Sequence, residues 1–148
     1  MNEETKQLLK EWAVRYHCTD FIKDDPVQFP HRFGTKQDIE VSGLLTAVMS
    51  FGNRKQILAK VAHLHKLMGD SPHRYVLSRQ WATDFSPDDF RSFYRMLSVA
   101  DINRYLQLLY EAYSGYESLE DALQEYSGSP MDRLCAFLGV SAKSPQKK

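Results

Sequence analysis

The residues best suited to bind a charged ligand stand together at a predicted helix start. Asn53 follows Gly52 and precedes Arg54 and Lys55. A helix start presents unpaired backbone N–H groups that attract phosphate, and two basic side chains follow here at once. We therefore predict a site for a nucleic-acid backbone that comprises His31, Arg32, Asn53, Arg54, Lys55 and Lys66. An ordinary helix cap with solvated basic side chains would give the same pattern.

The histidines and carboxylates form no catalytic or metal-binding pattern. His63 and His65 are two residues apart, so on a helix they point about 200° apart and cannot share a metal ion. Asp38 and Glu40 are better explained by a helix start, with Asp38 as the N-cap and Glu40 favourable to the dipole. The sequence has no P-loop, GxGxxG, GxSxG or HExxH motif. We expect no catalytic residue, no metal and no cofactor.

Apolar spacings of three and four residues predict helices along nearly the whole chain. The longer ones cover residues 3–17, 38–50, 54–68 and 101–113, and no segment alternates strongly enough to predict a strand. Shorter helices are predicted to begin at four serines, Ser71, Ser86, Ser118 and Ser129. Residues 18–37 hold two prolines and are predicted as an extended loop pinned by Phe29 and Phe33. The fold class is all-α, with about eight helices too short and too numerous for a simple four-helix bundle.

Length and composition indicate one helical domain, over residues 1–141, followed by a flexible tail at 142–148. The chain has 148 residues, of which 43% are hydrophobic and 26% charged, and no apolar run long enough to cross a membrane. Cys18 and Cys135 are far apart and outside any CxxC pair, which predicts reduced thiols in the cytoplasm.

The charge is balanced overall and uneven along the chain. The formal net charge is +0, which argues against a globally basic nucleic-acid binder. Residues 31–80 carry 8 basic and 3 acidic groups, whereas residues 81–126 carry 3 and 9. A basic segment beside an acidic one fits either a surface that faces a polyanion or charge complementarity within the fold.

Several motifs resemble an uncharacterised bacterial family of conserved hypothetical proteins. The resemblance runs from about residue 16 to the end and rests on Asp25-Pro26-Val27, Phe29-Pro30-His31-Arg32-Phe33 and Asp38-Ile39-Glu40. It implies a loop-structuring role for Asp25, Pro26, Phe29, Pro30, Phe33 and Asp38. Family members continue beyond this length, so the chain resembles the N-terminal portion of a longer fold.

The same family distantly resembles helix-hairpin-helix DNA glycosylases, all-α proteins that flip a damaged base. This resemblance implies an orthogonal, glycosylase-like helical array in which residues 38–69 match the first helical pair. Gly52 then stands where a DNA-inserting glutamine is common. The catalytic half of those enzymes lies in the later part, so no activity is expected of this chain alone.

Two functions follow as hypotheses. The first is a domain that binds DNA or another polyanion through the basic helix start. The alternative is a non-enzymatic protein–protein interaction domain with no nucleic-acid role, which exposed aromatic side chains would support. The candidates for such exposure are Tyr110, Tyr113, Tyr116 and Tyr126. A face left uncovered by a missing C-terminal half would also allow a homodimer to form.

Overall fold

The computed structural model describes residues 2–140, which form an all-α fold, as the sequence predicts. The α-helices are α1 (Glu3–Tyr16), α2 (Thr19–Lys23), α3 (Lys36–Met49), α4 (Arg54–Met68), α5 (Pro72–Ser78), α6 (Trp81–Asp84), α7 (Val99–Gly115), α8 (Leu119–Leu123) and α9 (Pro130–Leu138). Two 3-10 helices, η1 (Pro26–Gln28) and η2 (Pro30–Arg32), and two strands, β1 (Ser92–Tyr94) and β2 (Leu97–Ser98), complete the described chain. The tail predicted at 142–148 lies outside the described residues.

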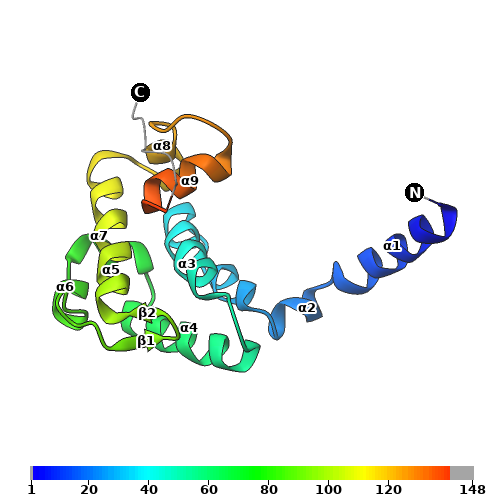
Figure 1. Cartoon of the computed structure of the whole chain (residues 1–148), viewed down its shortest axis with the longest axis horizontal. Helices are drawn as coiled ribbons and strands as arrows, with labels where there is room; N and C mark the ends of the chain where they lie inside the picture. Colours follow the sequence, from blue (N-terminus) through cyan, green and yellow to red (C-terminus); the bar gives the residue numbers. More distant parts are fainter. Residues whose placement is uncertain (1, 141–148) are drawn as a thin grey trace.

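The core lies between four helices. Figure 1 shows α3 in the middle of the body, with α4 and the hairpin at one end and α8 and α9 at the other. The side chains of α3, α4, α5 and α7 meet in one apolar cluster, whose most buried members include Val41, Leu45, Val61, Leu64, Val76, Leu106 and Leu109. These residues recur at helical spacing, which is why the sequence pattern predicts each helix.

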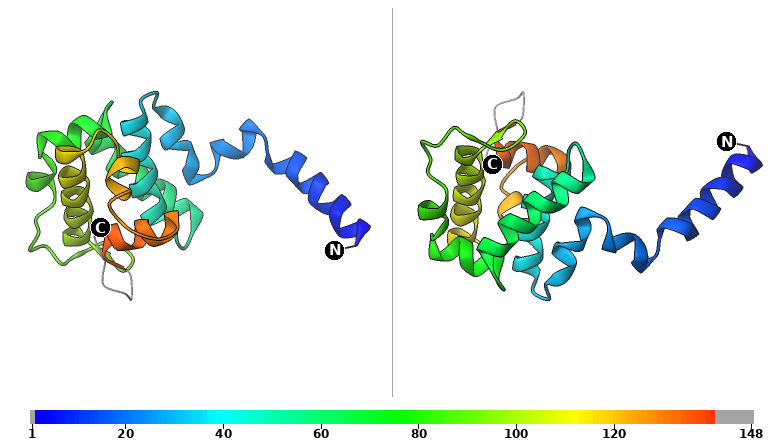
Figure 2. Two further views of the ribbon diagram at one scale, coloured as in Figure 1. Left: turned by 90° about the horizontal axis from the view of Figure 1, so that it is seen from above. Right: turned by 90° about the horizontal axis from the view of Figure 1, so that it is seen from below.

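Helix α1 lies outside this body. It extends away with α2 as an arm (Figures 1 and 2), and none of its residues is buried. The helix predicted at 3–17 is therefore confirmed, but its apolar face does not join the core; Tyr16 contacts α2, with its ring 5.9 Å from that of Phe21. Leu8, Trp12 and Tyr16 on that face are each about half exposed.

The predicted helix starts and ends are mostly confirmed. Asn53, Ser71, Ser118 and Ser129 each accept a hydrogen bond from a backbone N–H in the first turn of the following helix. Gly69 and Gly139 end α4 and α9 at positive φ angles of 66° and 68°, which glycine adopts without steric cost.

The prediction of an extended loop at 18–37 is wrong. The segment contains α2 and the two 3-10 turns, and each turn begins with a proline. Asp25 is extended, as expected before Pro26, but Phe29 is helical before Pro30, with φ −69° and ψ −53°. Phe29 is 2% exposed, so its burial outweighs the local preference.

The helix predicted after Ser86 is also wrong. Residues 92–98 form an antiparallel hairpin in place of a helix, with Arg95 at φ 53° in its turn. Phe93 and Tyr94 are both buried although they are adjacent, and the Tyr94 hydroxyl donates to the carbonyl oxygen of Phe51 at 2.7 Å. Tertiary contacts therefore decide the conformation of this short segment.

Asp38 does not cap its own helix. Thr35 is the N-cap of α3, and its side chain accepts from the backbone N–H of Asp38. The Asp38 carboxylate accepts instead from Ser71 Oγ and from the backbone N–H of His73, both at 2.9 Å, at the start of α5. Burial alone would raise the pKa of Asp38, but the hydrogen bonds from Thr35, His73 and Ser71 hold it below its ordinary value.

Glu40 makes the equivalent contact on the other side of α3. Its carboxylate accepts from the backbone N–H of Leu119 and from the Tyr113 hydroxyl, each at 2.9 Å, and from the backbone N–H of Glu120 at 3.3 Å. Burial is the main cause that raises the pKa of the Tyr113 hydroxyl, and the hydrogen bond to Glu40 raises it further. Two carboxylates of α3 therefore fix the starts of α5 and α8.

We expect Glu40→Ala to lower the free energy of unfolding by about 1–3 kcal/mol, because two buried donors lose their acceptor. Urea unfolding followed by circular dichroism measures the change. Glu117→Ala is the matched control, since the Glu117 side chain is exposed and should change stability by less than about 0.5 kcal/mol. Equal losses in the two variants would contradict this role of Glu40.

Candidate nucleic-acid interface

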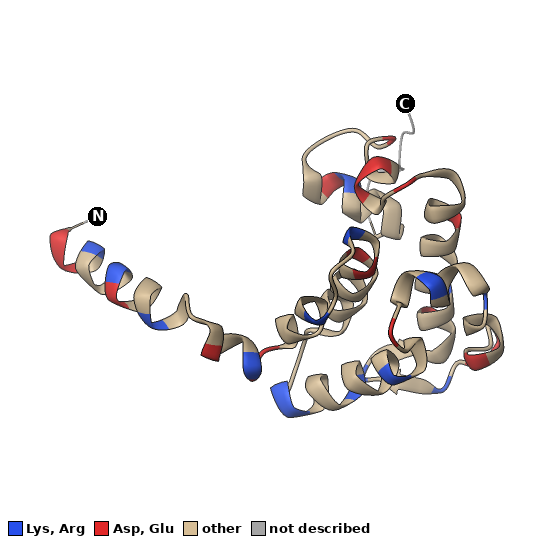
Figure 3. Cartoon of the chain, turned by 180° about the vertical axis from the view of Figure 1, so that it is seen from behind, with Lys and Arg blue, Asp and Glu red and all other residues tan. Residues whose placement is uncertain are grey.

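Helix α4 carries basic residues and no acidic ones. Lys55, Lys60 and Lys66 lie on it with Arg54, and no Asp or Glu occurs between Arg54 and Met68. One side of α4 packs on the core through Ile57, Val61, Leu64 and Met68. The opposite side faces solvent, and Figure 3 shows Lys and Arg along this helix.

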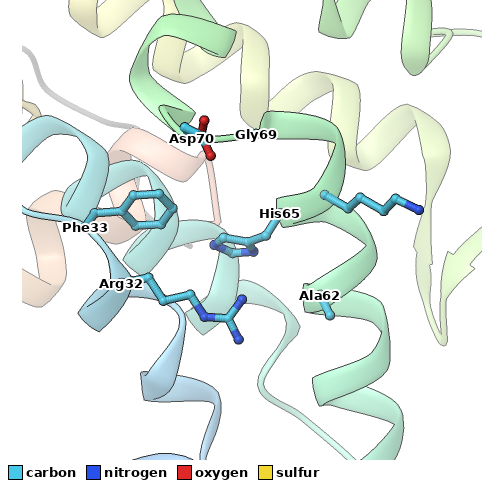
Figure 4. A pocket seen from close by; sticks show the side chains of 7 residues that line it. Arg32, Phe33, Ala62, His65, Gly69 and Asp70 are labelled. Atoms are coloured by element: carbon cyan, nitrogen blue, oxygen red, sulfur yellow. The ribbon is translucent and has the colours of Figure 1, made fainter.

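A hollow of about 580 Å³ lies between α4 and the η2 segment. Arg32 and Phe33 line it from η2 and the residue that follows, while Ala62, His65 and Lys66 line it from α4 (Figure 4). Asp70, just beyond the end of α4, adds one carboxylate at the rim. The hollow is mostly polar and carries two cationic side chains, Arg32 and Lys66, which are 34 residues apart in the sequence.

His65 joins the two elements that line this hollow, α4 and the η2 segment. Its Nδ1 is 2.9 Å from the carbonyl oxygen of Val61, so Nδ1 carries the proton and Nε2 accepts from Ser42 Oγ at 2.7 Å. The imidazole packs 4.8 Å from the Phe29 ring, and the Arg32 guanidinium lies 4.5 Å from the centroid of the same ring. The Phe29 ring therefore lies between the His65 imidazole and the Arg32 guanidinium, and this stack fixes the position of Arg32 beside α4.

The Ser42–His65 pair is a packing contact between α3 and α4. Ser42 is 0% exposed, so no substrate reaches its hydroxyl. The second ring nitrogen of His65 bonds a backbone carbonyl oxygen, where a hydrolytic triad would place a carboxylate. The sequence does not reveal this pair, because the two residues are 23 positions apart.

The helix start itself offers little to an anion. Asn53 Oδ1 already accepts from the backbone N–H groups of Lys55 and Gln56, at 3.0 and 3.3 Å. Arg54 turns toward Asp25, with 3.8 Å between Nη2 and Oδ2. An anion near α4 would therefore meet side chains along the helix more readily than backbone N–H groups at its start.

The structure brings only some of the six residues of the predicted nucleic-acid site together. Arg32 and Lys66 line the same hollow, and Lys55 lies three turns before Lys66 on the same side of α4. Asn53 and Arg54 have the partners described above, and the exposed side chain of His31 lies outside the lining of the hollow.

The loop-structuring motif has a visible role. Asp25 accepts from the backbone N–H of Val27 at 3.0 Å, Pro26 is buried, and Pro30 begins η2. Phe29 and Phe33 flank His65, with ring centroids 4.8 and 6.1 Å from the imidazole.

Two further cations that the sequence analysis did not select lie on the other side of α4. Lys60 and Arg95 line a second hollow, next to Gln56 and Phe93. Lys60 Nζ is 5.2 Å from the Phe93 ring, and the Arg95 guanidinium is 5.9 Å from the Phe51 ring. Arg95 could not be assigned to this surface from the sequence, because only the hairpin brings it beside α4. Of residues 2–140, no carboxylate pairs with the side chains of Lys55, Lys60, Lys66 or Arg95.

The buried His65 predicts a pH dependence of stability. Burial, aided by nearby Arg32, lowers the pKa of His65, and the hydrogen bond to Val61 opposes this only in part. The unfolded chain therefore binds more protons once the pH falls through the ordinary histidine value of about 6.5. We expect the full stabilisation above that value and a progressive loss as the pH falls below it. Urea unfolding at several pH values measures it.

The matched variants are His65→Gln and His63→Gln. The first should remove most of the pH dependence in this range, and the second, at an exposed position, should keep it. An unchanged slope in His65→Gln would refute the assignment.

Groups that could hold a metal ion are absent from the described chain, because residues 2–140 contain no cluster of three or more His, Cys, Asp or Glu side chains. Within the same residues, no helix has the length and apolarity needed to cross a membrane.

Comparison with known proteins places the chain in a family and gives no further match. Neither the curated proteins nor the solved structures contain a significant match to the chain. A family described as "Protein of unknown function (DUF2400)" matches residues 25–146. That range begins at Asp25, in the motif that forms η1 and η2, and leaves out α1 and α2. By this match over most of its length, the chain belongs to the DUF2400 family.

Proposed function

We propose that the chain binds a nucleic-acid backbone through the solvent-facing side of α4 and the flanking Arg32. The observation that carries the proposal is the separation of charge. Lys55 and Lys66 share one stripe of a helix without acidic residues, and no described carboxylate pairs with them. Cations that have no acidic partner in their own fold are available to phosphates.

The acidic residues of the chain support the same proposal by their position. Within the described chain, the ion pairs of residues 81–126 are Arg91 with Asp89 at 2.6 Å and Glu120 with Lys36 at 2.6 Å. None of them involves α4. The uneven charge of the sequence therefore leaves α4 as a basic surface.

The distant resemblance of the family to helix-hairpin-helix DNA glycosylases, inferred from the sequence, is a second reason to propose a nucleic-acid partner. We include no enzymatic activity in the proposal, because the lining of the hollow contains no Ser, Thr or Cys side chain and a single carboxylate, Asp70. Cys18 and Cys135 are free thiols, which supports our placement of the chain in a reducing compartment such as the cytoplasm.

The test is fluorescence anisotropy of a labelled DNA duplex at several salt concentrations. We expect saturable binding whose logarithm falls linearly with the logarithm of salt, and we expect Lys55→Gln/Lys66→Gln to flatten that slope by about 2 units if both contact phosphates. The control, Lys6→Gln/Lys10→Gln on α1, removes the same net charge and should leave the slope unchanged. No binding at low salt, or equal effects of the two double variants, would refute the proposal.

A second candidate function is self-association through α1, and the exposed apolar face of that helix favours it. Leu8, Leu9, Trp12 and Tyr16 are each 45–50% exposed on one side of a capped helix. The polar side is balanced, with three acidic and three basic residues, so it does not match an anionic membrane surface and would not repel a second copy. The four tyrosines that would support a protein–protein interaction surface do not form an exposed face. Of Tyr110, Tyr113, Tyr116 and Tyr126, Tyr113 is buried and Tyr116 alone is exposed.

We expect Trp12→Ala to weaken the dimer by about tenfold or more, because a large aromatic side chain at a helix interface is commonly a dominant contact. Analytical ultracentrifugation over a range of concentrations measures the dissociation constant. Val14→Ala, on the opposite side of α1 and 80% exposed, is the control and should leave it unchanged. A chain that stays monomeric at all concentrations removes this candidate.

A further inference from the structure

We propose that α4 enters the major groove of duplex DNA and reads bases through Gln56 and His63. This inference rests on the proposed function and adds the kind of nucleic acid and the residues that discriminate its sequence. It is based on the row of exposed side chains along α4 and on the cations that lie on both sides of that row.

The middle of this exposed side carries small and hydrogen-bonding residues. Gln56, Ala59 and His63 are all exposed, and their spacing of three and four residues places them in one row. A glutamine amide can donate to and accept from an adenine edge, an imidazole can bond a purine, and a small side chain permits close approach to a thymine methyl. Leu67, 37% exposed, follows one turn after His63, and the Phe93 ring of the hairpin lies 6.1 Å from the His63 imidazole.

Cations border this row on both sides. Lys66 lines the hollow that Arg32 lines, and Lys55 lies three turns before it on the same side of α4. On the other side, Lys60 lines the hollow that Arg95 lines, which Gln56 and Ala59 also reach. Charges at the edges and hydrogen-bonding groups in the middle match a groove, where phosphates run along both rims and base edges form the floor. A surface that only attracted polyanions would not require hydrogen-bonding side chains between two sets of cations.

The dimensions favour B-form DNA over RNA. An α-helix with its side chains is about 10–12 Å across and fits the major groove of B-DNA, which is about 12 Å wide. The major groove of A-form RNA is deep and narrow, so it does not admit the helix. The 15 residues of α4 make a rod of about 22 Å, long enough to place both Lys55 and Lys66 at the rims.

The first arm of the experiment compares three labelled probes of about two helical turns: a DNA duplex, the RNA duplex of the same sequence and the single DNA strand. We expect the DNA duplex to bind at least about tenfold more tightly than the RNA duplex. Dimethyl sulfate footprinting should show protection at guanine N7, in the major groove, and none at adenine N3, in the minor groove. Equal affinity for the two duplexes, or protection at adenine N3, would overturn the inference.

The second arm tests the readout. Selection from a pool of randomised DNA duplexes should give a preferred sequence for the unaltered chain. Gln56→Ala/His63→Ala should lose about tenfold or more of that preference while keeping the salt slope, because neither residue carries a phosphate contact in this arrangement. Gln7→Ala/His17→Ala, at exposed positions of the arm, is the matched control. A preference that survives in Gln56→Ala/His63→Ala, or the lack of any preferred sequence, contradicts the inference.

The two proposals fail differently. If no probe binds at low salt, both are wrong. If the probes bind alike and Lys55→Gln/Lys66→Gln still flattens the salt slope, the chain binds nucleic acid through its backbone alone and only the major-groove inference is wrong.

Discussion

The fold depends on two carboxylates at the start of α3 that bind the starts of other helices. Asp38 and Glu40 are two residues apart, so their side chains leave α3 on different sides. The Asp38 carboxylate accepts hydrogen bonds from the Ser71 hydroxyl and the His73 N–H at the start of α5. The Glu40 carboxylate accepts from the N–H groups of Leu119 and Glu120 at the start of α8. A helix start has donors without partners and a partial positive charge, and a carboxylate satisfies both. One turn of α3 thereby fixes the position of α5 and α8.

The basic surface follows from the same helix. Ser42, one turn after Asp38, is buried and donates to His65, which fixes the side of α4 that faces α3. Phe29 packs against the imidazole, and the Arg32 guanidinium lies over Phe29. Since the core side of α4 is determined in this way, its lysines must face solvent. Arg32 is positioned beside them by its packing on the Phe29 ring and by its hydrogen bond to Gln28 Oε1 at 3.0 Å.

The sequence predicts much of the fold because the helix signals are local. A serine or asparagine before each start, a glycine after an end and apolar spacing of three and four residues act within one or two turns, and they locate α4, α5, α8 and α9 well. The sequence does not predict the hairpin at 92–98, because Phe93 and Tyr94 are buried by contacts with distant residues, among them His63 and Phe51. The sequence predicts Asp38 as a capping residue of its own helix, since no local pattern shows that α5 lies beside it.

The candidate site divides in the same way. The charge of α4 can be read from the sequence, because Lys55 and Lys66 are separated by three full turns of one helix. The groups around it cannot, because Arg32 and Arg95 reach α4 from positions more than 20 residues before it and more than 25 after it. A helix start looked like the natural anion site, but a capping asparagine competes with any anion for the same N–H groups. The more effectively a residue caps a helix, the less that helix start can bind a ligand, so a well-capped basic helix is expected to meet phosphates with its side chains.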